Sequence, residues 1–204
     1  ITTRTFLDNL MTMALFILYS LPSFWVAMIL VIYLGGGEYL NLFPVSGVFS
    51  QGVEQLPLAG RIGNMIWHLV LPVTVLTYGG FAFLARISRA QLLEVIRQDY
   101  IRTARAKGLS ERTVLWRHAL RNSLIPLITL SGTLLPAMIG GSVIVEQIFS
   151  IPGMGKLGFE AVLSRDYPTV MAIAAIEAVL TLAGLLVSDL LYVVVDPRIS
   201  FEKI

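Results

Sequence analysis

Long stretches without charged side chains are the feature that most constrains this sequence. No Asp, Glu, Lys or Arg occurs between Asp8 and Glu38, between Arg61 and Arg86, or between Arg121 and Glu146. Each stretch exceeds the roughly 20 residues that a helix needs to cross the hydrocarbon core of a bilayer. A fourth stretch, residues 167–195, is interrupted only by Glu177 and Asp189. We therefore predict an all-α, polytopic transmembrane helical bundle, with four spans near residues 10–34, 64–86, 122–145 and 169–195.

Composition disfavours the alternative, a soluble helical protein with a large apolar core. Charged residues make up only 14% of the chain, whereas a soluble domain usually carries about 25%. The chain contains no cysteine and only two histidines, His68 and His118, which lie in separate regions. The sequence therefore offers neither a disulfide framework nor a metal site.

The positive charges are concentrated in one loop. Nine of the fifteen Lys and Arg residues lie within 86–121: Arg86, Arg89, Arg97, Arg102, Arg105, Lys107, Arg112, Arg117 and Arg121. Cytoplasmic loops of membrane proteins carry the excess of Lys and Arg, so we predict that the loop 87–121 faces the cytoplasm. With four spans, both termini of this chain then lie on the cytoplasmic side.

The pattern within this loop predicts two helices joined by a sharp turn. Residues 88–107 lack Gly and Pro and are rich in helix-forming residues. Their apolar side chains recur every three or four residues, which gives the helix one apolar stripe: Leu93, Ile96, Tyr100 and Ala104. Gly108 suits the left-handed residue that ends a helix, and Ser110 suits the N-cap of a second helix running from Glu111 toward Arg121. We expect the turn to expose small side chains, namely Thr103, Ala104 and Ala106.

Three interpretations of this surface are open on the residues alone. It could be a solvated positive loop, a site for anionic lipid, or a docking helix for a partner protein. The capping signals and the apolar stripe exceed what charge alone requires.

Two segments of the loop resemble a known family. Asp99-Tyr-Ile-Arg-Thr-Ala-Arg-Ala-Lys-Gly-Leu-Ser110 and Arg117-His-Ala-Leu-Arg-Asn-Ser-Leu-Ile-Pro126 are similar to the EAA loop of inner-membrane permeases of ABC importers, in its dipeptide, oligopeptide and nickel branch. Residues 42–47, 146–156 and 196–199 resemble other segments of the same branch. The Arg165-Asp-Tyr-Pro168 segment resembles the first, or B-type, of the two permease subunits.

This resemblance implies a type I ABC importer permease of a bacterial or archaeal inner membrane, moving peptides or related small solutes. The implied partners are a second permease subunit, two cytoplasmic ATPase subunits and an extracytoplasmic solute-binding protein. ATP and Mg would be bound by the ATPase subunits, so this chain itself would be no enzyme and would hold no cofactor. By motif, the ATPase-coupling positions are Tyr100, Arg102, Thr103, Ala104, Arg105, Ala106, Lys107, Gly108, Leu109 and Ser110.

The chain departs from the general family pattern in three respects. Arg102-Thr-Ala104 stands where the general motif has Glu-Ala-Ala, and Pro126 lies eighteen residues after Gly108. Both departures resemble the peptide branch. The family usually has six spans, whereas we predict four, so we expect the first two spans of the family to be absent from this chain or to lie on residues outside the given sequence.

Two carboxylates within the fourth predicted span are further candidates. Charges inside a membrane are costly and mark functional sites by default, so Glu177 and Asp189 are candidates for the translocation path or for the interface with a second permease. They also support an alternative, an ion-coupled secondary transporter or channel. A third reading is a membrane scaffold whose basic loop recruits a cytoplasmic partner.

One nucleotide-like motif is rejected. Gly153-Met-Gly-Lys-Leu-Gly158 matches G-x-G-x-x-G, but it lies in a predicted loop between spans, without the strand and helix of a dinucleotide-binding unit. No nucleic-acid partner is expected.

Overall fold

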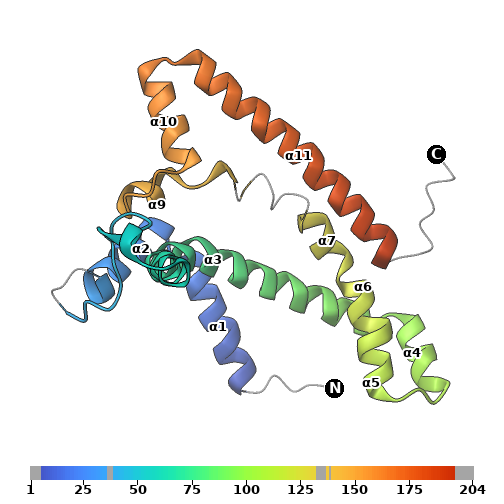
Figure 1. Cartoon of the computed structure of the whole chain (residues 1–204). Helices are drawn as coiled ribbons and strands as arrows, with labels where there is room; N and C mark the ends of the chain where they lie inside the picture. Colours follow the sequence, from blue (N-terminus) through green and yellow to red (C-terminus); the bar gives the residue numbers. More distant parts are fainter. Residues whose placement is uncertain (1–5, 36–38, 132–136, 138, 196–204) are drawn as a thin grey trace. The chain divides into compact units, whose positions relative to one another are not determined.

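The computed structural model describes residues 6–35, 39–131, 137 and 139–195, and these contain helices but no strand. The chain divides into two compact units, residues 1–82 with 140–173 and residues 83–139 with 174–204. The α-helices, labelled in Figure 1, are α1 (Phe6–Ser20), α2 (Ser23–Leu30), α3 (Leu58–Ile96), α4 (Asp99–Ala106), α5 (Glu111–Thr113), α6 (Arg121–Ser123), α7 (Ile125–Ser131), α9 (Val143–Ile148), α10 (Met154–Ser164) and α11 (Tyr167–Val195). Short π-helical segments occur at Val31–Gly35 and Val114–Leu120, and a 3₁₀ turn at Val53–Gln55.

Two helices are long and apolar enough to cross a membrane, Leu58–Ile96 and Tyr167–Val193. The predicted spans at 64–86 and 169–195 fall on these helices. Most large apolar side chains of α11 are exposed in the isolated chain. Lipid or a partner subunit must cover such a surface, because a contiguous apolar patch of this size is unstable in water. The predicted all-α membrane fold is confirmed.

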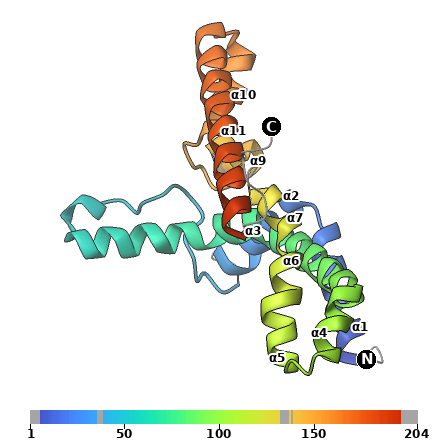
Figure 2. The same ribbon diagram turned by 90° about the vertical axis from the view of Figure 1, so that its right-hand side faces the viewer.

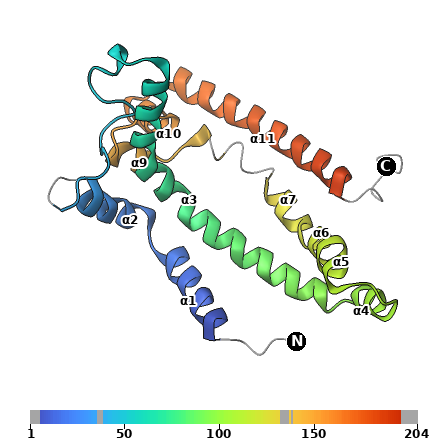
Figure 3. The same cartoon turned by 60° about the horizontal axis from the view of Figure 1, so that its bottom comes forward.

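The first predicted span is bent rather than straight. Residues Asn9–Ser20 and Ser23–Gly35 meet at 96°, and the structure has three candidate spans if this pair counts as one (Figure 3). Pro22 explains the bend, because proline lacks the N–H that would continue a helix. The bend leaves the carbonyl of Leu21 without a helical partner, and the Tyr78 hydroxyl donates a hydrogen bond to it at 2.5 Å.

The third predicted span, 122–145, contains a break near its end. Its beginning is helical in α6 and α7, while residues 132–136 and 138 lie outside the described residues. Gly141 has a positive φ of 64°, and the hydroxyl of Ser142 accepts a hydrogen bond from the Val145 N–H at the start of α9. A new helix therefore begins inside the range where we predicted one continuous span.

The first unit has a small apolar core. Ala27 of α2, Leu71 and Val75 of α3, Val145 of α9 and Phe149 just after α9 are all almost fully buried. Beside it, the buried His68 ring bonds the Gly47 carbonyl through Nδ1 at 3.1 Å and the Ser50 hydroxyl through Nε2 at 2.9 Å. His68 is thus a satisfied structural histidine that ties the loop before α3 to that helix.

The Arg165-Asp-Tyr-Pro168 segment forms the turn from α10 into α11. Arg165 is left-handed, with φ of 58°, which ends α10. The Asp166 carboxylate accepts hydrogen bonds from the Thr169 N–H at 3.2 Å and hydroxyl at 2.6 Å, as an N-cap residue does. Pro168 lies in the first turn, where its missing N–H is harmless. These two hydrogen bonds lower the pKa of Asp166 below its ordinary 3.8.

We predict that Asp166→Ala speeds amide exchange at Thr169 and Val170 several-fold, because the first turn of α11 loses its cap. In Asp166→Asn the exchange rates of these two amides should stay close to those of the parent protein, since Asn caps as well as Asp. The pKa of Asp166 is lower in the folded protein than in the unfolded chain. Its contribution to stability is therefore present above pH 3.8 and is lost as the pH falls through the lowered pKa. Hydrogen exchange by mass spectrometry tests this, and equal rates in Asp166→Ala and the parent would contradict it.

Candidate functional site

The basic loop folds into a helical hairpin in the second unit. We call residues 97–123 the basic hairpin; it comprises α4, the turn 107–110, α5, the π-helical segment Val114–Leu120 and α6. Figure 2 shows α4 lying beside α5 at the end of α3. The predicted arrangement of two helices and a sharp turn is therefore confirmed.

The first predicted helix, 88–107, is broken near its middle. The helix α3 ends at Ile96, and α4 begins only at Asp99. Between them the N–H groups of Arg97 and Gln98 bond the carbonyls three residues earlier, and Gln98 is extended, with ψ of 149°. The only sequence signal for this break is Asp99, whose acidic side chain suits a first helical turn.

The predicted apolar stripe is confirmed only in part. Ile96 and Ala104 belong to the apolar cluster between α3, α4 and the returning arm, whereas Leu93 and Tyr100 are 43% and 42% exposed. The buried residues of α4 are Ile101 and Ala104, which pack with Val114 and Ala119 of the returning arm and with Leu92, Val95 and Ile96 of α3. Ala104 is only 7% exposed, so our expectation that it forms part of the exposed surface is wrong. Thr103 and Ala106 are exposed as expected.

Gly108 ends α4 as predicted. Its φ is 76°, a conformation that costs other L-residues energy because of their Cβ atom. The Gly108 N–H bonds the Arg105 carbonyl at 2.9 Å and the Leu109 N–H bonds the Ala104 carbonyl at 3.4 Å. This pair of bonds is a Schellman motif, which satisfies the last carbonyl groups of a helix.

The second arm begins at the predicted N-cap, and an ion pair closes the turn. The Ser110 hydroxyl accepts a hydrogen bond from the Thr113 N–H at 3.4 Å. Across the turn, Arg105 Nε and Glu111 Oε1 lie 2.7 Å apart, with a second contact at 3.4 Å between Nη2 and Oε2. Farther along, Asn122 donates to the Tyr100 hydroxyl at 2.8 Å. Sequence reasoning missed both contacts, because each joins residues that meet only when the hairpin closes.

The predicted coupling residues thus divide into two groups. Ala104 and Arg105 hold the hairpin together, one by burial and the other through Glu111. The other eight, at the tip and on the outer side of α4, are exposed: Tyr100, Arg102, Thr103, Ala106, Lys107, Gly108, Leu109 and Ser110. Trp116, 67% exposed on the returning arm, was not predicted; an aromatic residue in a basic loop was the available signal.

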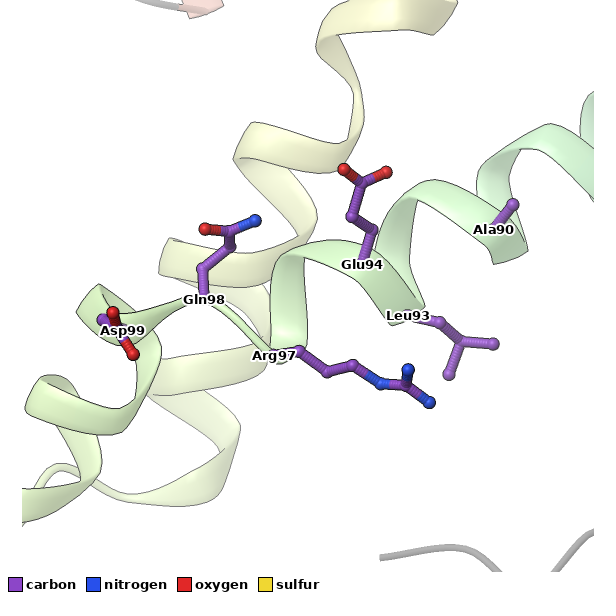
Figure 4. A pocket seen from close by; sticks show the side chains of 6 residues that line it. All are labelled: Ala90, Leu93, Glu94, Arg97, Gln98 and Asp99. Carbon is purple, nitrogen blue, oxygen red and sulfur yellow. The ribbon is translucent and has the colours of Figure 1, made fainter.

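A groove of about 470 Å³ lies at the root of the basic hairpin. It is lined by Ala90, Leu93, Glu94, Arg97, Gln98 and Asp99 (Figure 4). Leu93 and Arg97 extend from one side of the helix, and Glu94 and Gln98 from the other. Because both signs of charge occur here, this root is chemically distinct from the basic tip.

The two intramembrane carboxylates lie on α11, within the second unit. Both Glu177 and Asp189 are exposed in the isolated chain. Next to Asp189, the buried Ser188 hydroxyl donates to the Ile128 carbonyl at 3.0 Å, and Tyr192 forms a short hydrogen bond with Thr129. These contacts fix α7 against the C-terminal half of α11.

Within the described ranges, no group of three or more His, Cys, Asp or Glu side chains could hold a metal ion. What the second unit offers is a rigid, exposed, mostly basic helical tip attached to a membrane-spanning helix.

Comparison with known proteins gives the family. Residues 2–201 match the family described as "Binding-protein-dependent transport system inner membrane component", so the chain belongs to this family of membrane transport components.

Similar proteins support the same family assignment. The chain is 46% identical over 195 residues to the oligopeptide transport system permease protein AppB of Bacillus subtilis, covering 96% of this chain and 60% of AppB. It is 40% identical over 182 residues to the dipeptide transport system permease protein DppB of Lactococcus lactis, covering 88% of this chain and 54% of DppB. It is also 40% identical over 185 residues to the inner membrane ABC transporter permease protein YejB of Escherichia coli, covering 90% of this chain and 51% of YejB. The chain therefore spans between half and two thirds of the length of these relatives.

We predict that Ala104→Leu opens the basic hairpin, whereas Ala106→Leu does not. Leucine at 104 would overfill the contact with Val114 and Ala119, at a cost of about 1–3 kcal/mol. Leucine at the exposed position 106 should change stability by less than about 0.5 kcal/mol. Hydrogen exchange of the α4 amides distinguishes the two variants. Equal exchange in both would show that Ala104 is not a packing residue.

Proposed function

We propose that this chain forms the membrane-spanning part of a permease subunit in an ATP-driven importer of peptides or related small solutes. The observation that carries the proposal is the family match across almost the whole chain, together with relatives whose names are those of oligopeptide and dipeptide permeases. The translocated solute crosses unchanged, so the chain itself catalyses no covalent reaction.

The basic hairpin is the proposed contact with a cytoplasmic ATPase. Its tip exposes small and cationic side chains at Thr103, Ala106 and Lys107, while its buried side holds Ile101 and Ala104 against the end of α3. A force applied to the tip is therefore delivered to a long membrane helix rather than absorbed by a flexible loop. This arrangement favours docking of a protein over the solvated-loop and lipid-binding interpretations.

The proposal implies a specific set of partners. Two ATPase subunits bind ATP and Mg on the cytoplasmic side, a second permease subunit completes the pore, and a binding protein delivers solute from outside. The basic hairpin and both termini of this chain then lie in the cytoplasm, in agreement with the excess of Lys and Arg in the loop.

Gly108 provides the sharpest test of the coupling role. A Cβ atom at this position would meet nothing within 4 Å, so substitution acts only through the positive φ. Valine should cost about 1–2 kcal/mol, which corresponds to a roughly 5- to 30-fold shift in a conformational equilibrium. Asparagine tolerates this conformation and serves as the matched control.

We therefore predict that Gly108→Val lowers both the amount of ATPase subunit that co-purifies with the full-length protein and the uptake of radiolabelled dialanine and trialanine. Gly108→Asn should behave like the parent protein. The assay uses liposomes containing the permeases and ATPases, with the binding protein added outside. Full uptake and normal co-purification in Gly108→Val would contradict the coupling role.

Glu177 and Asp189 are proposed to lie in the translocation path or at the contact with the second permease. Their exposure in the isolated chain supports this, because a carboxylate in a membrane must face water or a polar partner. We predict that Glu177→Gln lowers peptide uptake and that uptake remains strictly dependent on ATP in both the parent and the variant. ATP-independent, cation-driven uptake that Glu177→Gln abolishes would instead identify an ion-coupled carrier.

A further inference from the structure

The first unit contains a buried carboxylate that the proposed function does not use. Glu146, on α9, is only 7% exposed. Its Oε1 accepts a hydrogen bond from the Ser142 N–H at 3.0 Å, and its Oε2 accepts one from the Lys156 N–H at 2.6 Å. A buried charge is tolerated only when hydrogen bonds replace water, and each of these oxygens faces a donor. Both oxygens of the buried carboxylate are therefore satisfied by backbone donors.

The second of these bonds makes Glu146 the cap of a different helix. Gly153 occupies the N-cap position of α10 and has no side chain to bond the first turn. Lys156 is the third residue of that helix, whose N–H an N-cap side chain normally bonds. Glu146 supplies this acceptor from α9, and its negative charge lies at the positive end of the α10 dipole.

Glycines make the space that the carboxylate fills. A Cβ atom on Gly153 would lie 2.3 Å from Glu146 Cδ, and one on Gly141 would lie 2.0 Å from Oε1. The backbone of Gly153, with φ of −108° and ψ of 173°, is open to any residue, so only the carboxylate requires glycine there. In contrast, a Cβ atom on Gly158 would make an ordinary 3.5 Å contact with Ile173. The first glycine of the rejected nucleotide-like motif is thus explained by Glu146.

Glu146 also connects two parts of the first unit. Its neighbours Val145 on α9 and Phe149 at the end of α9 belong to the buried core with α2 and α3. The helix that it caps, α10, leads through the Asp166 turn into α11. The carboxylate therefore joins the core to the beginning of the long apolar helix.

We propose that Glu146 is a positioning residue: its carboxylate clasps α9 to the N-terminus of α10 and so fixes the beginning of α11 for transport. The role in transport rests on the proposed function, whereas the clasp itself does not.

A double-mutant cycle on the full-length protein tests the clasp. We expect Gly153→Ala to lower the midpoint of thermal unfolding by several degrees, because the new methyl group displaces the carboxylate. In a Glu146→Ala background the same substitution should change the midpoint little, since the obstructed group is gone. Gly158→Ala on the same helix is the control and should leave the midpoint unchanged or raise it. Additive effects of the two substitutions would overturn the clasp.

Glu146→Gln keeps the shape of the side chain and tests the role in transport. Its amide places an NH₂ group against one of the two N–H donors, so one bond is lost. Per assembled complex, we expect the maximal rate of trialanine uptake to fall several-fold. The half-saturating concentration and the ATPase co-purification should not change, because the basic hairpin is untouched. A merely structural role would lower the yield of assembled complex but not the uptake rate per complex.

Failure of the role of Glu146 in transport can be distinguished from failure of the proposed function. Unchanged uptake per complex in Glu146→Gln, with a non-additive thermal cycle, would overturn the role in transport and leave the clasp. If the parent complex shows no ATP-dependent peptide uptake, the proposed function fails, and the thermal cycle still decides the clasp.

Discussion

The need to satisfy every backbone N–H and carbonyl group is the constraint on which this structure depends. A lipid bilayer supplies no water to these groups, so helices must be continuous or each break must be repaired by a side chain. At the bend beside Pro22, the Tyr78 hydroxyl bonds the Leu21 carbonyl. At the break beside Gly141, Ser142 and Glu146 bond the free N–H groups of α9 and α10. Polar side chains therefore satisfy the backbone at the points where these helices bend or begin.

The two units use this constraint for different purposes. In the first unit, Glu146 and His68 hold irregular segments against a small apolar core, which gives broken helices a fixed geometry. In the second unit, the basic hairpin closes on itself through Ile101 and Ala104 and leaves its cationic tip exposed. A membrane transport component of this family can thus present a rigid contact at the end of α3 although the chain around it is mostly apolar.

Local rules predicted the turn of the basic hairpin but not its packing. Gly108 and Ser110 were identified correctly, because a C-terminal glycine and an N-cap serine depend only on their immediate neighbours. The packing of α4 was predicted only in part: Ala104 was expected to be exposed and is buried, and Ile101 is buried where Tyr100 was expected to continue the apolar stripe. The ion pair of Arg105 with Glu111 and the bond of Asn122 to Tyr100 join residues whose proximity depends on that packing.

By itself the sequence determined that this protein is an all-helical membrane protein, where its basic loop lies and where that loop turns. These properties follow from uncharged stretches, charge asymmetry and local capping, all of which can be read along the chain. Only the tertiary structure decided that Ala104 is buried, that the first predicted span bends, and that Glu146 caps a helix ten residues away. Each of these depends on contacts between segments whose relative position is fixed only when the helices pack.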